Sequence, residues 1–236
     1  MKISTILFTI LSLSFFGCSQ KNQNQIDLSG QWQFQIDSLD VGVAEKWFER
    51  NLPEHVQLPG SMAENGKGNN VSVSTKWTGN VIDKSWYTDE RYAKYRESGN
   101  VKIPFWLQPE KHYIGAAWYQ TDVEVPDDWS GSHHELFLER CHWETQVWLD
   151  GQYIGMQNSL GTANVFDITE YLTPGKHRFS IRVDNRIKDI NPGVNSHSIS
   201  DHTQSNWNGI AGKMCISKSP QTYLQNIQLY PDIHRK

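Results

Sequence analysis

The polar run at residues 201–208 holds the densest set of side chains that could recognise a sugar. It reads Asp-His-Thr-Gln-Ser-Asn-Trp-Asn. Carboxylates and amides hydrogen-bond to hydroxyl groups, and an indole offers a flat apolar face to the C–H surface of a sugar ring. The run therefore suits carbohydrate recognition. In the alternative interpretation, internal hydrogen bonds hold the run and Trp207 belongs to the core.

A second group of residues has the composition of an acid–base set. Glu139 and Glu144 flank Arg140 and His142. A retaining glycosidase needs two carboxyl groups about 5 Å apart. These residues lie on a predicted hairpin, which favours a buried Arg–Glu pair that stiffens the fold.

Two histidines raise the question of a metal. His197 and His202 are five positions apart, but no third strong ligand accompanies them. Zinc sites in proteins take three or four protein ligands. We predict neither a metal nor a cofactor.

The elements that would position these residues are strands. Residues 136–138 lead through the charged span to a strand that ends at Asp150-Gly151, a pair that favours a type I′ hairpin. Residues 31–36 and 117–125 alternate apolar and polar side chains. Residues 177–184 alternate most regularly, which predicts Phe179, Ile181 and Val183 inside and Arg178, Ser180 and Arg182 outside. Residues 227–229 are expected to close the sheet. The pattern predicts an all-β fold of two packed antiparallel sheets.

Residues 65–108 interrupt this pattern. Glycines break the segment, and six Trp and Tyr residues populate it. Such aromatic content argues against disorder. We predict an ordered inserted loop region over one end of the sandwich, with one helical turn at Tyr92–Tyr95.

Composition excludes some classes of function. The net charge is −4, and the isoelectric point is about 6.1. Without a basic run, nucleic-acid binding is not expected. Ten tryptophans in 236 residues are many. They suit either a large core or a surface for sugar rings.

The first residues predict export. Lys2 precedes an apolar stretch at 6–16 that is too short to span a membrane. Gly17-Cys18 then suggests a bacterial lipoprotein with lipidated Cys18, and a polar tether follows to residue 25. Residues 1–17 are thus the predicted signal peptide and 18–25 the tether. We expect a periplasmic or outer-membrane-anchored protein whose only contact with a membrane is its lipid.

Two cysteines remain in the predicted fold. Cys141 and Cys215 both fall in apparent strands. An oxidising compartment would allow them to pair. A buried free thiol is nevertheless the commoner outcome for strand cysteines, and we predict two free thiols.

Several segments together resemble the N-terminal sugar-binding domain of glycoside hydrolase family 2, the family of β-galactosidases and β-glucuronidases. The charged hairpin resembles the signature of that domain. Five further segments resemble its first strand, the loop after it, two later segments and the loop into the final strand: Leu28–Phe34, Leu58–Ser61, Ala117–Gln120, Phe166–Thr169 and Asp201–Ile210. The resemblance runs from Ile26 to Ile233, so we assign 26–236 to this domain.

The resemblance implies a jelly-roll-like, galactose-binding-like β-sandwich that contacts carbohydrate. In this family the loop that corresponds to 201–208 approaches the catalytic pocket, and another loop reaches its rim. The implied substrate-binding residues are Asp201, His202, Asn206, Trp207 and Asn208, with Trp77 and Asn80 from the second loop.

The resemblance also implies that the catalytic residues lie outside this domain. The family's catalytic glutamates belong to a separate barrel, and a barrel takes about 250 residues. The Asn-Glu dipeptide that precedes the family's acid/base does not occur in this chain. We therefore expect a non-catalytic, carbohydrate-contacting domain of a β-galactosidase-like enzyme, which needs a catalytic barrel either in cis or from a separate, neighbouring polypeptide. The alternative is a free-standing, lectin-like module on the cell surface.

Overall fold

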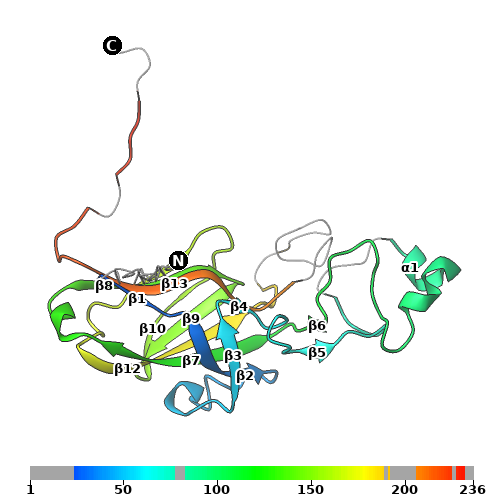
Figure 1. Cartoon of the computed structure of the whole chain (residues 1–236), viewed down its shortest axis with the longest axis horizontal. Helices are drawn as coiled ribbons and strands as arrows, with labels where there is room; N and C mark the ends of the chain where they lie inside the picture. The colour runs from blue at the N-terminus through cyan, green and yellow to red at the C-terminus, as the bar shows by residue number, and fades with distance from the viewer. Residues whose placement is uncertain (1–23, 78–82, 189–190, 192–205, 225–226, 232–236) are drawn as a thin grey trace, which may run out of the picture.

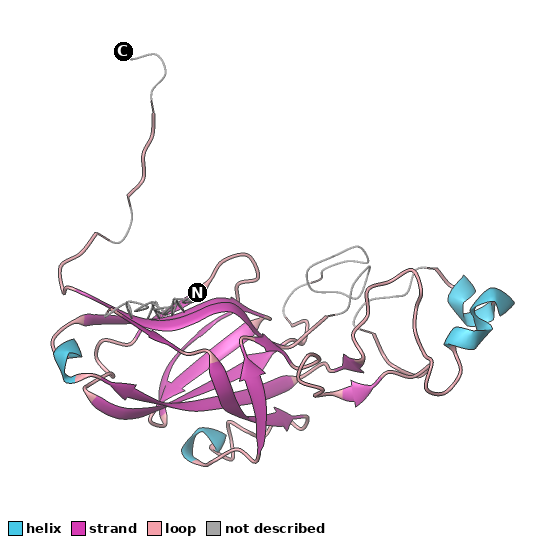
Figure 2. Cartoon of the chain, viewed as in Figure 1, coloured by secondary structure: helices cyan, strands magenta, loops and turns pink. Residues whose placement is uncertain are grey.

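Two antiparallel sheets face each other as a sandwich in the computed structural model of the chain (Figures 1 and 2). The structure describes residues 24–77, 83–188, 191, 206–224 and 227–231. The predicted all-β sandwich is therefore confirmed.

Each sheet has a simple strand order in this part of the chain. The five-stranded sheet contains, in order, β1 (Gln25–Asp27), β13 (Gly209–Ser219), β8 (His133–Cys141) and β11 (Asn164–Asp167), with β4 (Gly60–Ser61) also paired to β13. The six-stranded sheet contains, in order, β10 (Gln152–Gln157), β9 (Glu144–Leu149), β12 (Gly175–Asp184), β7 (Ala116–Val125), β2 (Gly30–Asp37) and β3 (Glu54–Leu58). Two short 3-10 helices, η1 (Trp47–Glu49) and η3 (Asp127–Trp129), lie in the connections.

Local sequence explains the best-predicted strands. Asp150 and Gly151 have φ values of 49° and 82°, which the turn between β9 and β10 requires. In β2 the alternate residues Trp32 and Phe34 are buried, as the pattern predicted. Buried residues from the facing sides of both sheets form one continuous core.

The outer face of the six-stranded sheet differs from the prediction. Ser180 and Arg182 were expected to face solvent, yet they are 1% and 3% exposed. The connection between β2 and β3 covers this face, and Trp47 packs there with Trp118 and Trp148. Alternation in β12 therefore separates two buried environments, one apolar and one largely polar.

The inserted region extends away from one end of the sandwich instead of lying over it (Figure 1). It contains β5 (Asn69–Asn70), α1 (Ser85–Thr88), η2 (Glu90–Tyr95) and β6 (Lys111–His112), and β5 pairs with β6. The predicted helical turn at Tyr92–Tyr95 is confirmed by η2. Trp86, Ile103 and Trp106 give the region a small core of its own. None of the helices that the structure describes is long and apolar enough to cross a membrane.

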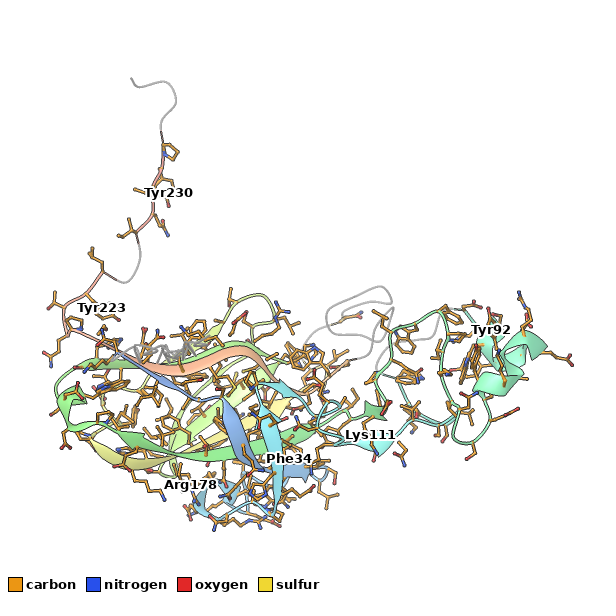
Figure 3. The ribbon with its side chains drawn as sticks, in the orientation of Figure 1. Phe34, Tyr92, Lys111, Arg178, Tyr223 and Tyr230 are labelled. Carbon is orange, nitrogen blue, oxygen red and sulfur yellow. The ribbon has the colours of Figure 1, made fainter. Side chains whose placement is uncertain are left out.

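The predicted closing strand at 227–229 is wrong. β13 is the last strand along the described chain, and Ile227 and Leu229 are 70% and 85% exposed. The segment that carries Tyr230 stands away from the sandwich (Figure 3). Tyr223 is still attached, because its hydroxyl hydrogen-bonds to His133.

Both predicted free thiols are confirmed. Cys141 and Cys215 are unpaired and buried. They lie in the neighbouring strands β8 and β13, where Ile210 is opposite Cys141 and Phe137 is opposite Cys215.

Candidate functional site

Four of the seven predicted binding residues can be placed. Asp201, His202 and Asn80 lie outside the described residues, as do His197 and Cys18. Among the described residues, no group of three or more His, Cys, Asp or Glu side chains is placed to hold a metal ion. The other four predicted residues, Trp77, Asn206, Trp207 and Asn208, lie within the described part of the chain.

Asn208 serves the interior of the fold. Its side-chain N–H groups donate to the carbonyl oxygens of Gly115 and Val183, each at 3.0 Å. Its Oδ1 accepts from the hydroxyl of Tyr119 at 2.8 Å. With both N–H groups engaged and 2% of its surface exposed, Asn208 ties the start of β13 to the ends of β7 and β12.

Asn206 and Asn185 add further hydrogen bonds beside those of Asn208. Asn206 donates to the carbonyl of Asn185 at 2.9 Å. Asn185, which directly follows β12, donates to the carbonyls of Tyr113 and Trp207 and accepts from the backbone N–H of Gly115. Buried amides can satisfy backbone groups that have no strand partner. These asparagines therefore fix the backbone on both sides of Trp207.

Trp207 is held at its backbone while its side chain stays partly exposed. His142 Nδ1 lies 2.8 Å from the Trp207 carbonyl oxygen. The imidazole of His142 also stacks on the indole. The next strand pairs Gly209 with Ser61 of β4, so the indole projects where the sandwich meets the inserted region.

A cleft of about 810 Å³ lies at this junction. Three chain segments contribute its lining, two from the sandwich and one from the inserted region. The sandwich supplies Trp207, Ser61, Ala63, Glu64 and Ala211, and the inserted region supplies Trp106, Leu107, Gln108, Pro109 and Glu110. Its size suits a small ligand. The partly exposed face of Trp207 provides an aromatic surface inside it.

Trp77 contacts the cleft-lining residue Trp106 but does not itself line the cleft. Its ring packs edge-on against Trp106, with centroids 4.8 Å apart, and against His112 at 4.7 Å. Trp77 is not among the residues that line the cleft. The structure thus brings the two predicted loops together, with Trp106 between Trp77 and the cleft.

Sequence reasoning missed Trp106, Glu64 and Glu110 as parts of the site. The aromatic density of residues 65–108 gave a weak signal for Trp106, whereas nothing in the sequence pointed to the two glutamates. Their convergence depends on the path of the insertion, which brings 106–110 back beside the segment that follows β4.

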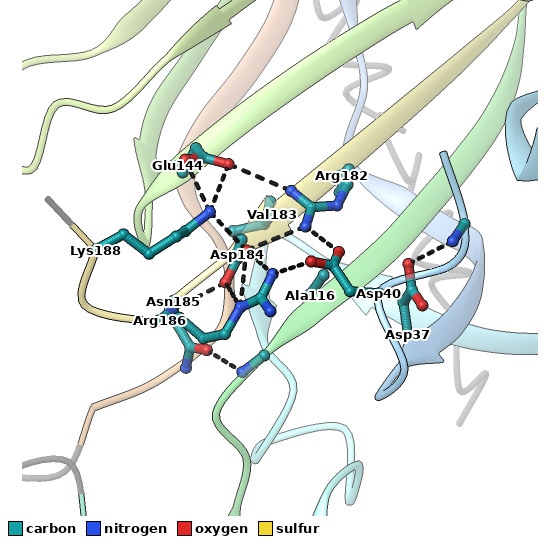
Figure 4. A network of polar contacts seen from close by, with 12 residues as sticks. Asp37, Asp40, Ala116, Glu144, Arg182, Val183, Asp184, Asn185, Arg186 and Lys188 are labelled. Atoms are coloured by element: carbon teal, nitrogen blue, oxygen red, sulfur yellow. Dashed lines mark hydrogen bonds and ion pairs between the residues drawn. The ribbon is translucent and has the colours of Figure 1, made fainter. Parts of the chain in front are cut away.

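The candidate acid–base set does not form. Glu144 pairs with Arg182 at 3.3 Å and with Lys188 at 3.0 Å (Figure 4). A buried Arg–Glu pair therefore exists, but its arginine is Arg182, while Arg140 is exposed. Glu139 accepts the backbone N–H of Lys213 at 2.6 Å, where the pairing of β8 and β13 is irregular. Both glutamates thus serve the fold.

The pair belongs to a larger ionic network. Asp184 is fully buried and binds Arg182, Arg186 and Lys188, while Asp40 binds both arginines (Figure 4). Burial alone would raise the pKa of Asp184, but hydrogen bonds from Arg186 and Lys188 outweigh it and hold this pKa well below its usual range. The network locks the end of β12, from which the chain continues to Asn185.

Comparison with known proteins points to one family. A family model described as "Glycosyl hydrolases family 2, sugar binding domain" matches residues 26–220. The chain is 28% identical over 212 residues to a β-galactosidase of Oenococcus oeni and 24% identical over 203 residues to one of Pectobacterium atrosepticum. These alignments cover 87% and 86% of this chain but only 17% of each relative.

Solved structures agree at the level of the fold. A β-glucuronidase of Ruminococcus gnavus superposes with a TM-score of 0.56 at 18% identity, over 86% of this chain and 29% of that one. A β-glucuronidase of an uncultured Clostridium species gives a TM-score of 0.57 at 20% identity, over 92% and 31%.

Proposed function

Because the chain belongs to the family of sugar-binding domains of the family 2 glycosyl hydrolases, we propose that it contacts a carbohydrate without cleaving it. The observation that carries this proposal is the position of Trp207. Its partly exposed indole lines the cleft, while its backbone is fixed by Asn185 and His142. A rigidly held aromatic face suits the C–H surface of a sugar ring, since little side-chain freedom is lost on binding.

The non-catalytic half of the proposal rests on the carboxylates. Glu139 and Glu144, the pair considered for acid–base work, are engaged by Lys213 and by the ionic network. Glycoside hydrolysis requires two carboxyl groups that face each other across a substrate. We propose that a catalytic barrel, on this or on a separate polypeptide, supplies that chemistry, with a β-galactoside or β-glucuronide as substrate, the two activities named for the relatives.

Titration calorimetry with the purified chain tests carbohydrate contact. Phenyl β-galactoside should bind with a dissociation constant on the order of 1 mM or below, and Trp207→Ala should weaken binding about tenfold or more. Tyr153→Ala is the matched control, since Tyr153 is a 49% exposed aromatic residue on β10 that does not line the cleft. Flat heats with the unmodified chain would overturn the contact with sugar.

A colour assay tests the proposal that the chain does not cleave a glycoside by itself. The chain alone should release no nitrophenol from nitrophenyl β-galactoside or β-glucuronide. Turnover by the purified chain, abolished by substitution of its own glutamates, would show that it is an enzyme by itself.

The place of action is a separate proposal that the sequence alone supports. We propose that the chain is exported and anchored to a bacterial membrane surface by lipid on Cys18. Cys18→Ser should move the protein from the membrane fraction to the soluble periplasmic fraction. An unchanged distribution would refute the anchor.

A further inference from the structure

We infer that Glu64 and Glu110 make the cleft selective for uncharged, hydroxyl-rich sugars and against sugars that carry a carboxylate. This inference rests on the proposed carbohydrate contact and decides between the two substrate classes named for the relatives. Both glutamates line the cleft together with Trp207. Ionised carboxylates only accept hydrogen bonds, so they match the hydroxyl donors of a neutral sugar and repel a uronic acid.

Glu64 is fixed in place by Ser61. Its Oε2 accepts from the backbone N–H of Ser61 at 2.8 Å and from the Ser61 hydroxyl at 3.1 Å. The same hydroxyl accepts from the backbone N–H of Glu64 at 3.2 Å. Because Ser61 engages Oε2, the other carboxylate oxygen is available to a ligand. A carboxylate fixed in this way cannot swing far from an incoming charge.

Glu110 brings the second negative charge from the inserted region. Neither Glu110 nor Glu64 forms an ion pair with any residue that the structure describes. The amide of Gln108, also in the lining, is already used: its Oε1 accepts from the Ile103 N–H and its Nε2 donates to the Val101 carbonyl. The acidic groups are therefore the main polar groups that this lining offers.

Two lysines line a smaller adjoining hollow beside Pro109 and Trp207. Lys67 there is paired with Glu54 at 2.7 Å. Lys111 donates to Asn70 Oδ1 at 2.6 Å, across the β5–β6 pair, at the place where the inserted region joins the sandwich (Figure 3). The cleft lining itself holds two carboxylates and neither lysine nor arginine, so its charge is negative.

A uronic acid in the cleft would therefore meet like charge without a compensating arginine in the lining, the residue best suited to hold a carboxylate.

Paired titrations of the full chain with phenyl β-galactoside and phenyl β-galacturonide test the inference, because the two ligands differ only at C6, where a carboxylate replaces the hydroxymethyl group. The galactoside should bind about tenfold more tightly at low salt, from charge repulsion at a few ångströms. The difference should shrink with added salt. It should also shrink in Glu64→Gln and Glu110→Gln, and most in the double variant.

Glu124→Gln is the matched control, since it removes the same charge from the exposed far end of β7, outside the cleft lining. It should leave the ratio of the two affinities unchanged. Equal affinities, or tighter binding of the galacturonide by the unmodified chain, would overturn the selectivity while leaving carbohydrate contact intact. If neither glycoside binds, the proposed function fails, and the selectivity fails with it.

Discussion

The imidazole of His142 lies against the indole of Trp207, with ring centroids 4.8 Å apart and ring planes inclined by 28°. The same imidazole hydrogen-bonds to the Trp207 carbonyl. One side chain thus supports both the ring and the backbone of the residue that gives the cleft its aromatic face. His142 follows directly after β8, so this support comes from the five-stranded sheet.

Substitutions at His142 should separate the two kinds of support. His142→Phe keeps a flat ring beneath Trp207 and loses the hydrogen bond, which should cost about 1 kcal/mol of unfolding free energy. His142→Ala also loses the ring, and the cavity should raise the cost to about 3 kcal/mol. Urea unfolding measures both values, and equal losses in the two variants would mean that the stacking contributes nothing.

Asp184→Asn should be strongly destabilising. The change removes a buried charge and leaves Arg182, Arg186 and Lys188 close together with less compensation. Breaking a buried ionic network from one side costs about 3–5 kcal/mol. Asp122→Asn provides the comparison. It breaks an exposed pair with Arg178 and should cost about 1 kcal/mol or less.

The same carboxylate predicts a dependence of stability on acid. Because the folded-state pKa of Asp184 lies below its unfolded value, its contribution is fully present above about pH 5 and is lost as the pH falls towards the folded-state pKa. Unfolding free energies measured from pH 7 to pH 3 should fall steeply in the unmodified chain and less steeply in Asp184→Asn. Parallel curves would contradict this assignment.

Two tryptophans of the inserted region should respond differently to phenylalanine. The indole N–H of Trp86 donates to the Lys102 carbonyl at 2.7 Å, whereas the buried indole N–H of Trp106 has no hydrogen-bond partner within the described structure. Trp86→Phe leaves a carbonyl without its donor and should cost about 1–3 kcal/mol more than Trp106→Phe. Thermal unfolding of the two variants measures the difference.

The two cysteines should be unreactive in the folded protein. Burial raises the pKa of the Cys141 thiol to about 12, despite an opposing hydrogen bond with Thr145, and burial also raises the pKa of Cys215. Thiolate is the reactive form. At pH 8 a disulfide reagent should therefore modify neither residue within minutes and both after denaturation. Fast reaction before unfolding would show that the strands β8 and β13 open readily.

Gly209 should be intolerant of alanine. It has φ +148°, and a Cβ there would lie 2.5 Å from the Gly60 carbonyl oxygen. Gly209→Ala should therefore separate β4 from β13, cost several kcal/mol and weaken sugar binding at Trp207. Gly155→Ala, whose Cβ would meet only Phe166 at 3.8 Å, is the control and should be mild.

The strands and turns could be predicted because their signals are local. The alternation in β2 and the Asp150-Gly151 turn depend on neighbours in sequence. The burial of Arg182 could not be read in the same way, since it depends on Asp40 and on the cover formed by residues 38–53. Polar alternation looks the same whether the outer face meets water or an ionic network.

The residues of the cleft could also be predicted only in part, because their contacts depend on the fold. Trp207 was identified from its polar neighbours, but Asn208 proved to serve the interior, because an amide's partners are set by the fold and not by its position in a run. Glu64 and Glu110, 46 positions apart, converge only through the course of the insertion.

The ladder between β5 and β6 has a mechanical consequence. It joins Asn69 to His112 and Asn70 to Lys111, beside the contact of Trp77 with His112. This short ladder joins the segment that follows Glu64 to the segment that follows Glu110, and both glutamates line the cleft. The width of the cleft therefore depends on a two-stranded connection outside the main core, where substitutions leave the two large sheets untouched.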